Sequence, residues 1–214
     1  CRVDTQHYVD APLRDGAPVF LMMGRLMRDK GVYDYLEAAR IVQRQYGDVR
    51  FQLLGRPEES NRTGISVAEV HRLSSEYPVE FLAETRDVRP YLAQCSVFVL
   101  PSFYREGLPR TILEAMSSGR AVITTDMPGC RDPIEHEGNG LLVPAKSPQD
   151  LAKAMIRLVE DPEMLRKMSR RSREIAEQTY DVKIVNHMLL DAMDLIAHDG
   201  PMQRAQSQTI PYAA

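Results

Sequence analysis

The sequence predicts an α/β fold in which a parallel sheet is covered by helices on both faces. Short apolar runs recur along the 214 residues, and most of them stop at a glycine or a polar turn. Segments with the apolar spacing of an amphipathic helix separate these runs. Short apolar strands that alternate with helices are typical of a Rossmann-like sheet, whose ligands bind at the carboxyl ends of the strands.

The first half of the chain shows this alternation. An apolar run over residues 19–23 ends at Gly24, and residues 31–46 then carry apolar side chains on one helical face before Gly47. The other elements expected here are a strand at 51–54 that ends at Gly55, a helix at 67–76, a strand at 79–82 and a helix from an Asp87 cap to Gln94.

The second half continues the pattern. Residues 97–100 are the fourth predicted strand, and the stretch 101–119, PSFYREGLPRTILEAMSSG, supplies a loop and a helix with Pro109 at its first position. The remaining expected elements are strands at 121–124 and 140–143 and helices at 149–160, 163–178 and 181–198, opened by Pro148, Pro162 and Asp181.

Composition limits the function classes. Apolar residues at 43% and charged residues at 27% are usual for a globular protein with one sizeable core. The net charge of −3 gives no general attraction for nucleic acid, so an anion must be bound by a local cluster of cations. The apolar runs are shorter than the ~18 residues of a membrane span. Three cysteines without metal-ligand spacing favour a reduced, cytoplasmic setting.

The chain begins at Cys1 and runs directly into a linker-like segment. We therefore expect a piece of a longer protein, in which residues 1–18 are the linker from a missing N-terminal domain. Residues 19–198 are expected to form one ligand-binding domain. The small, polar and aperiodic residues 199–214 predict a disordered tail.

Two cations mark the first predicted βα turn. Arg25 and Lys30 lie between Gly24 and Gly31, next to the start of a helix, where they can neutralise a diphosphate. The turn has neither the GxxxxGK[ST] nor the GxGxxG pattern, which argues against kinase-like and NAD-type sites. Taken alone, the turn is more typical of an ordinary βα turn with two solvated cations.

Two carboxylates bracket the start of the helix in the stretch 101–119. Glu106 and Glu114 have seven residues between them, and Arg110 and Thr111 offer N–H groups at the helix start. A carboxylate accepts hydrogen bonds from two hydroxyl groups and is a common ligand of ribose or sugar. A loop acid and a solvated helix residue remain the alternatives for these two glutamates.

Several motifs now occur in a specific order. They are GRL at 24–26, KG at 30–31, LPS at 100–102, EGLP at 106–109, LEAM at 113–116 and GLLV at 140–143. In this order they resemble the C-terminal half of retaining GT-B glycosyltransferases of family four, over residues 3–182. DVRPY at 87–91 and PGCR at 128–131 are most similar to bacterial enzymes that add an acetamido sugar to polyprenyl-diphosphate-linked glycans.

The resemblance implies a role for each matching position. Arg25 and Lys30 would stabilise the departing nucleotide diphosphate, and Glu106 would contact the donor sugar; these three are the expected catalytic residues. Glu114 would hold the ribose hydroxyls. The full expected donor site consists of Gly24, Arg25, Lys30, Gly55, Arg56, Leu82, Ala83, Glu84, Glu106, Gly107, Leu108, Pro109, Arg110, Thr111 and Glu114.

The resemblance also implies the partners. The donor would be a UDP-linked hexose or acetamido-hexose, and the acceptor a glycan carried on polyprenyl diphosphate at the inner face of the cytoplasmic membrane. The sequence has no Asp-x-Asp motif, in agreement with a family that uses neither metal nor cofactor. We expect the donor site to contain no metal and the protein to bind no nucleic acid. We also expect the missing N-terminal domain of the same protein to be a partner.

Two alternatives remain at this point. A non-catalytic module could bind a nucleotide or a sugar phosphate, although the abrupt start at Cys1 argues against a self-contained module. A sugar-phosphate hydrolase or epimerase could use Glu106 and Glu114 as acid and base, which requires one carboxyl group with a raised pKa.

We expect residues 1–214 alone to bind the donor weakly and to transfer little or no sugar. The resemblance assigns acceptor binding and a catalytic histidine to the preceding domain, and none of the five histidines matches that position. A transfer assay with the isolated chain checks this expectation. Measurable transfer of sugar would contradict the expectation that the chain holds only half of the active site.

Overall fold

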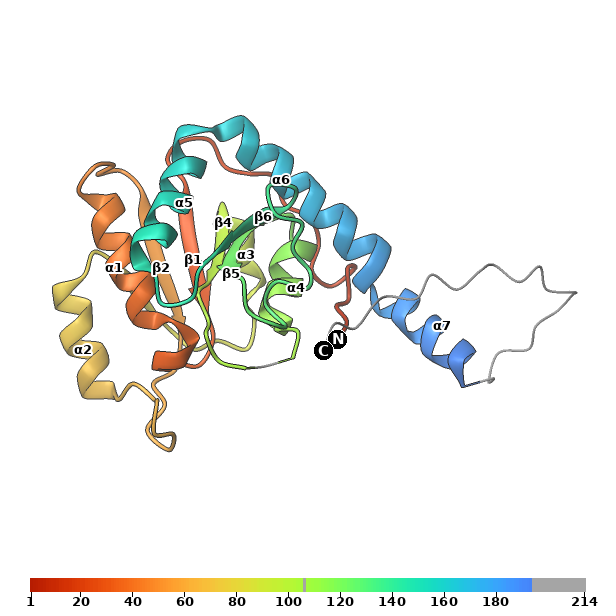
Figure 1. The fold of residues 1–214 in the computed structure, drawn as a ribbon, viewed down its shortest axis with the longest axis horizontal. Coiled ribbons are helices and arrows are strands. Elements are labelled where there is room, and N and C mark those ends of the chain that lie inside the picture. Colours follow the sequence, from red (N-terminus) through yellow and green to blue (C-terminus); the bar gives the residue numbers. More distant parts are fainter. Residues whose placement is uncertain (106, 194–214) are drawn as a thin grey trace, which may run out of the picture.

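The computed structural model describes residues 1–105 and 107–193. Its centre is a sheet of six parallel strands in the order β3-β2-β1-β4-β5-β6 (Figure 1). The strands are β1 (Val19–Met23), β2 (Arg50–Gly55), β3 (Glu80–Ala83), β4 (Val97–Leu100), β5 (Ala121–Thr125) and β6 (Gly140–Val143). Each lies within one residue of its predicted position, and the α/β fold class is confirmed.

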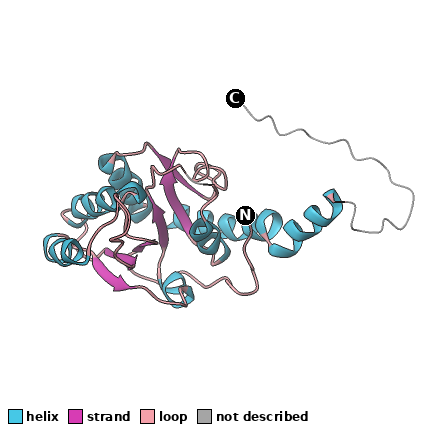
Figure 2. Cartoon of the chain, turned by 90° about the horizontal axis from the view of Figure 1, so that it is seen from below, coloured by secondary structure: helices cyan, strands magenta, loops and turns pink. Residues whose placement is uncertain are grey.

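Helices connect the strands and cover both faces. They are α1 (Val32–Gln43), α2 (Val67–Glu76), α3 (Arg89–Gln94), α4 (Arg110–Ser117), α5 (Pro148–Glu160), α6 (Pro162–Ile175) and α7 (Val182–Ala192), with short turns η1 (Arg28–Lys30) and η2 (Ala176–Tyr180). In Figure 1, α1, α2 and α5 lie on one side of the strands, and α3 and α4 lie on the other. This arrangement follows from right-handed crossovers between parallel strands. Figure 2 shows the same layers from below.

Some helix boundaries differ from the predicted ones. Pro109 is not the first residue of α4 but its N-cap, with an extended ψ of 124°. Asp87 lies one residue before the N-cap of α3, although its carboxylate still accepts a hydrogen bond from the Arg89 N–H at 3.1 Å. The helix expected at 163–178 ends at Ile175, because the wider π-helical turn η2 follows. The last residues of the helix expected at 181–198 and the tail at 199–214 lie outside the described residues.

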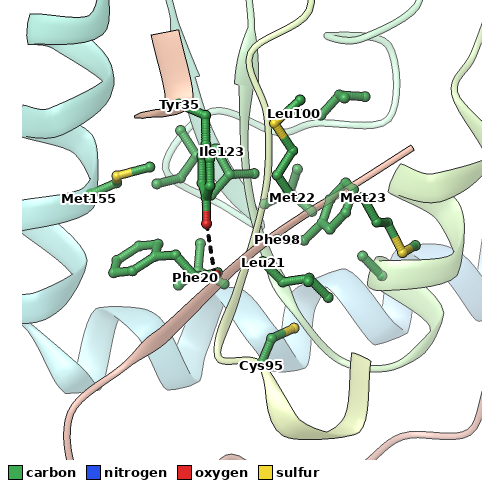
Figure 3. Close-up of a cluster of buried hydrophobic side chains, with 14 of the residues drawn as sticks. Phe20, Leu21, Met22, Met23, Tyr35, Cys95, Phe98, Leu100, Ile123 and Met155 are labelled. Carbon is green, nitrogen blue, oxygen red and sulfur yellow. Dashed lines mark hydrogen bonds between the residues drawn. The ribbon is translucent and has the colours of Figure 1, made fainter. Parts of the chain in front are cut away.

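The core is built on the central strands β1, β4 and β5 (Figure 3). All residues of β4 and β5 are buried, as expected for strands covered on both faces. Tyr35 of α1 is also fully buried, and its hydroxyl lies 2.9 Å from the Phe20 carbonyl and 3.0 Å from the Gln52 carbonyl. A buried hydroxyl is tolerated here because backbone acceptors surround it.

The order of the strands fixes where a ligand site can form. β1 pairs with β2 on one side and with β4 on the other. Strands β1 to β3 are added toward one edge of the sheet and β4 to β6 toward the other, so the strand order reverses between β1 and β4. Such a switch point leaves a crevice at the carboxyl ends of the two strands. The turns after Met23 and after Leu100 therefore face the same crevice.

The N-terminal segment, residues 1–18, follows the surface of the domain through specific contacts. Val3 pairs with the backbone on both sides of Asp181, at 2.9 and 2.8 Å. Arg173 of α6 donates to the carbonyls of Thr5 and Tyr8, at 3.1 and 2.8 Å. Fully buried Arg120 donates to the carbonyl of Ala11. The segment predicted as a linker is thus fastened to the domain over much of its length.

Helix α7 extends away from the rest of the domain (Figures 1 and 2). None of its residues is buried, and Met188, Leu189 and Leu190 are exposed. No helix among the described residues is long and apolar enough to cross a membrane.

Replacement of Gly31 by alanine should destabilise the fold by about 3 kcal/mol. Gly31 has a left-handed φ of +80°, and an added Cβ would lie 2.1 Å from the carbonyl oxygen of Pro101. Urea unfolding measures the difference. Gly47→Ala is the matched control, because its Cβ would meet nothing within 4 Å. Equal losses in the two variants would contradict the close approach at Gly31.

Candidate functional site

A cavity of about 260 Å³ lies at the carboxyl ends of β1 and β2, against α4. Its lining combines strand ends, the turns that follow them and two side chains of α4. The lining residues are Met23, Gly24, Arg25, Leu54, Gly55, Arg56, Glu84, Thr85, Val88, Thr111 and Glu114. The cavity therefore occupies the switch point that the strand order creates.

A second cavity of about 150 Å³ continues the first one toward β4. The two share Met23, Gly24, Arg25 and Thr111 as lining residues, so together they form one crevice. The second cavity adds Met22, Lys30, Leu100, Pro109 and Arg110. Glu114 thus lies on the β2 side of the crevice, and Lys30 lies on the β4 side.

The floor of the crevice is made of closely packed backbone. The Gly24 N–H donates to the Leu54 carbonyl at 3.0 Å. A Cβ added at Gly55 would lie 1.9 Å from the carbonyl oxygen of Gly24. Only glycine allows the ends of β1 and β2 to approach this closely, and peptide groups are thereby presented at the cavity wall.

The start of α4 faces the crevice with donors. The N–H of Ile112 bonds to the Pro109 carbonyl at 3.2 Å and opens the helical hydrogen-bond pattern. The N–H groups of Arg110 and Thr111 precede that bond, and both residues line the cavity. First-turn N–H groups and the positive end of the helix dipole favour an anion at this position.

Arg25 stands between the crevice and a buried acid. Its guanidinium lies 3.7 Å from the carboxylate of Glu58, and the two side chains are 53% and 9% exposed. Hydrogen bonds from Ser60 lower the pKa of Glu58, so this acid stays charged beside Arg25. The carboxylate can orient one edge of the guanidinium while the other donors face the cavity.

Lys30 is positioned by the loop that follows β4. Its ammonium group lies 5.5 Å from the centre of the Tyr104 ring, within the range of a cation–π contact. The N–H groups of Phe103 and Tyr104 both donate to the carbonyl of Asp29, at 2.9 and 3.0 Å. The loop after β4 and the turn after β1 are therefore joined directly beside Lys30.

Glu114 is the more buried of the two acids that line the crevice in the described part of the chain, the other being Glu84. The Glu114 side chain is 12% exposed, and this burial raises the pKa of its carboxyl group. The nearby Tyr8 hydroxyl opposes the shift, as do Arg110 at 3.9 Å and His7. Burial outweighs these three contributions.

Most of the expected site residues converge on this crevice. Those that line it are Gly24, Arg25, Lys30, Gly55, Arg56, Glu84, Pro109, Arg110, Thr111 and Glu114. Leu82 and Ala83 belong to β3 and pair with the end of β2 without lining either cavity. Gly107 and Leu108 also do not line either cavity, and Leu108 packs against the core. Glu106 lies outside the described residues.

The structure adds residues that the sequence reasoning missed. Met23 is the last residue of β1, and Leu54 is the last residue but one of β2, so the strand ends alone could have indicated them. Thr85 and Val88 line the wall behind the end of β3. Contacts between distant parts of the chain bring Glu58 and Tyr8 to the site, and no local pattern indicates them.

A larger cavity of about 420 Å³ lies at the opposite ends of the strands. It is lined by residues 13–18, Ser96 and parts of α5 and α6, near the amino ends of β1 and β4. Ligands of open parallel sheets bind at the carboxyl ends, where the first-turn N–H groups of the following helices also point. We therefore assign the functional site to the smaller crevice.

Comparison with known proteins identifies the family of the chain. The family described as "Glycosyl transferases group 1" matches residues 17–161, which contain the whole crevice. The chain belongs to this family. The resemblance noted from the motifs is thereby confirmed.

Curated relatives in the family act on several sugars. The chain is 31% identical, over 85% of its length, to the N,N'-diacetylbacillosaminyl-diphospho-undecaprenol alpha-1,3-N-acetylgalactosaminyltransferase of Campylobacter jejuni, and covers 46% of that protein. It is 27% identical to the alpha-D-kanosaminyltransferase of Streptomyces kanamyceticus, over 82% of the chain and 45% of the relative. The chain thus spans about half the length of the curated relatives it matches.

Solved structures of other proteins share the fold. Anabaena Alr3699/HepE in complex with UDP superposes with a TM-score of 0.79 at 25% identity, over 91% of this chain and 56% of that one. The C-terminal domain of the group 1 protein LpcC from Francisella tularensis gives a TM-score of 0.74 at 23% identity, over 84% and 99%. The second match shows that the fold is that of the C-terminal domain of a GT-B glycosyltransferase.

Replacement of Glu114 by glutamine should change stability in a pH-dependent way. The folded pKa of Glu114 is raised above its ordinary 4.5, so the folded chain binds more protons than the unfolded chain between the two values. The stability of the parent therefore falls relative to Glu114→Gln as the pH rises from about 4 to about 7. Urea unfolding at both pH values measures this, and a difference independent of pH would contradict the raised pKa.

Proposed function

We propose that the chain is the donor-binding half of a retaining glycosyltransferase. It would bind a UDP-linked hexose or acetamido-hexose and present it to a hydroxyl group of a glycan acceptor. The observation that carries this proposal is the crevice itself, in which two cations, a helix N-terminus and a buried carboxylate surround the switch point of the sheet. Membership of the glycosyltransferase family supports it.

The diphosphate would occupy the side of the crevice toward β4. Arg25 and Lys30 line this side together with the N-terminus of α4. Arg offers a fork of donors and Lys a compact charge, and the helix adds N–H groups of fixed direction. Stabilisation would be greatest when the nucleotide diphosphate departs with its full negative charge.

The nucleoside would occupy the side toward β2. Glu114 would accept hydrogen bonds from the ribose hydroxyls, since a carboxylate offers two oxygens and no donor. The backbone around Gly55 and the side chains of Leu54 and Val88 give a partly apolar wall, which suits a planar base. The exposed pair Arg56 and Glu84, 4.0 Å apart, lies at the rim.

The proposed reaction needs no covalent intermediate on a glutamate. The acceptor oxygen forms a bond to the anomeric carbon on the face from which the diphosphate leaves, and the departing phosphate oxygen takes the proton of the acceptor hydroxyl. The configuration at the anomeric carbon is retained. In this proposal Arg25, Lys30 and the α4 N-terminus neutralise the leaving group, without a metal ion or a cofactor.

The relatives support the choice of donor and acceptor. A neighbour of the same fold was solved in complex with UDP. A relative from Campylobacter jejuni is named for transfer to an undecaprenol-diphosphate-linked sugar. We therefore propose a UDP-linked donor and an acceptor glycan on polyprenyl diphosphate, which would bring the protein to the inner face of the cytoplasmic membrane. The acceptor would be bound with an N-terminal domain of the same protein.

The raised pKa of Glu114 is also the property that an acid–base hydrolase would need. The position of Glu114 favours a hydroxyl ligand instead. It lines the cavity on the β2 side, whereas Lys30 and Pro109 line only the cavity on the β4 side. A proton donor to the leaving phosphate would have to lie in the cavity on the β4 side, where the diphosphate is proposed to bind.

Two alanine variants should separate the halves of the site. Arg25→Ala should weaken UDP binding about tenfold or more and leave uridine binding unchanged, because a charge-assisted contact to phosphate is lost. Glu114→Ala should weaken both ligands, because both carry the ribose. Calorimetry with UDP and uridine measures the two affinities.

The matched control is Arg40→Ala on α1. Arg40 is an exposed arginine paired with Glu37, away from the crevice, and its removal should alter neither affinity. If both site variants bound UDP as tightly as the parent, the assignment of the site would be wrong. If uridine diphosphate did not bind the parent chain at all, the proposed donor would be wrong.

A further inference from the structure

The loop after β2, residues 56–65, is joined to the turn that carries Arg25. The N–H of Leu26 donates to the carbonyl of Arg56 at 3.0 Å, and the carbonyl of Leu26 accepts the N–H of Ile65 at 2.9 Å. Backbone hydrogen bonds on both sides of one residue fix the two segments against each other. The loop and the turn therefore form one unit, and this unit holds Arg25 at the crevice.

Glu58 is the acid that this unit places beside Arg25. Its N–H donates to the Ile65 carbonyl at 2.9 Å, and a Cβ added at Gly64 would lie 1.8 Å from the carbonyl oxygen of Glu58. Its carboxylate accepts hydrogen bonds from the N–H of Ser60, at 3.2 Å, and from the Ser60 hydroxyl. The main chain and the carboxylate of Glu58 are thus both held in place, and the residue is only 8% exposed.

Arg25 stands between this carboxylate and the crevice. Arg25 lines both cavities, whereas Glu58 lines neither of them in the described part of the chain. Nη1 of Arg25 lies 3.7 Å from Oε2 of Glu58, which is an ion-pair distance beyond that of a hydrogen bond. The Ser60 hydrogen bonds keep the pKa of Glu58 below its ordinary value, so the acid is charged. A ligand in the crevice therefore meets a guanidinium whose charge is offset from behind.

The charge of a nucleotide diphosphate changes when it leaves a sugar. Near neutral pH the terminal phosphate of free UDP loses a second proton, so UDP carries one more negative charge than the same diphosphate esterified to a sugar. A fixed carboxylate behind Arg25 attracts the guanidinium and repels the phosphates, and both effects grow with the charge of the ligand. The released product is therefore penalised more than the bound donor.

We propose that Glu58 competes with the nucleotide diphosphate for Arg25 and thereby weakens the binding of the released product. The inference rests on the proposed function of Arg25 in the donor site. Glu58 acts through Arg25 and touches neither the sugar nor the phosphates. It offsets part of the stabilisation that Arg25 gives to the departing diphosphate, and in return UDP leaves the crevice sooner.

The test removes the charge of Glu58 and keeps its size. Glu58→Gln should bind UDP about fivefold more tightly than the parent does, the scale of one partly exposed ion pair. The β-methyl ester of UDP, which lacks the extra charge, should gain less, and uridine should bind as before. Calorimetry measures the three affinities. Stopped-flow measurement of UDP release should show a slower rate, since changes of affinity within one site lie mostly in dissociation.

The matched control is Glu59→Gln, which removes the same charge one residue along the loop. The Glu59 carboxylate accepts a hydrogen bond from the Val67 N–H at 3.3 Å, at the start of α2, and Glu59 lines neither cavity in the described part of the chain. Its replacement should leave the three affinities unchanged.

Glu58→Asp is a second test that does not depend on the folding of Glu58→Gln. The shorter side chain keeps its charge, can still accept the Ser60 N–H in an Asx turn, and withdraws the carboxylate from Arg25 by one methylene group. It should bind UDP more tightly than the parent does, with a smaller gain than that of Glu58→Gln.

The outcomes separate this inference from the proposed function. If Arg25→Ala weakens UDP binding while Glu58→Gln binds UDP no more tightly than the parent, the competition is wrong and the donor site stands. Equal gains for UDP and its methyl ester would overturn the selective effect on the released product. If the parent chain does not bind UDP, the proposed donor site fails, and the role of Glu58 behind it fails as well.

Discussion

The site depends on the direct junction between the turn after β1 and the loop after β4. The carbonyl of Asp29 accepts the N–H groups of Phe103 and Tyr104, and Gly31 packs against the backbone of Pro101. Only a residue without a Cβ permits this approach. Since strand order reverses at this point, the junction brings the cations of one βα unit beside the helix N-terminus of the next. The junction thereby holds Lys30 on the β4 side of the crevice.

The charged groups of the crevice must act locally, because the chain as a whole is acidic. With a net charge of −3, the protein has no broad positive field, so attraction for a diphosphate must come from a few groups at close range. Arg25 is held near Glu58, and Lys30 is held over an aromatic ring. On the other side, the burial of Glu114 works against its ionisation. A hydroxyl donor would replace part of the water that this carboxylate has lost.

Local sequence patterns were sufficient to predict the fold and part of the candidate site. The apolar runs identified all six strands, and the turn residues after them identified Gly24, Arg25 and Lys30, because the carboxyl ends of parallel strands share one edge. Pro109 was placed one position too far into α4, since its ring suits both an N-cap and a first helical residue. Leu82 and Ala83 were expected at the cavity but belong to β3 beside it. Tyr8 and Glu58 could not be predicted, because the folded chain alone brings them to Glu114 and Arg25.

The arginines that fasten the N-terminal segment contact its main chain. Arg173 binds the carbonyl oxygens of Thr5 and Tyr8, and Arg120 binds that of Ala11. Every residue type offers the same carbonyl oxygen, so these hydrogen bonds do not depend on the side chains of the residues that accept them. At residues 9–12, where only a carbonyl oxygen is held, the course of the segment and the identity of its side chains are therefore separable properties. Evolution can change the surface that residues 9–12 present while the path of the chain past α4 stays the same.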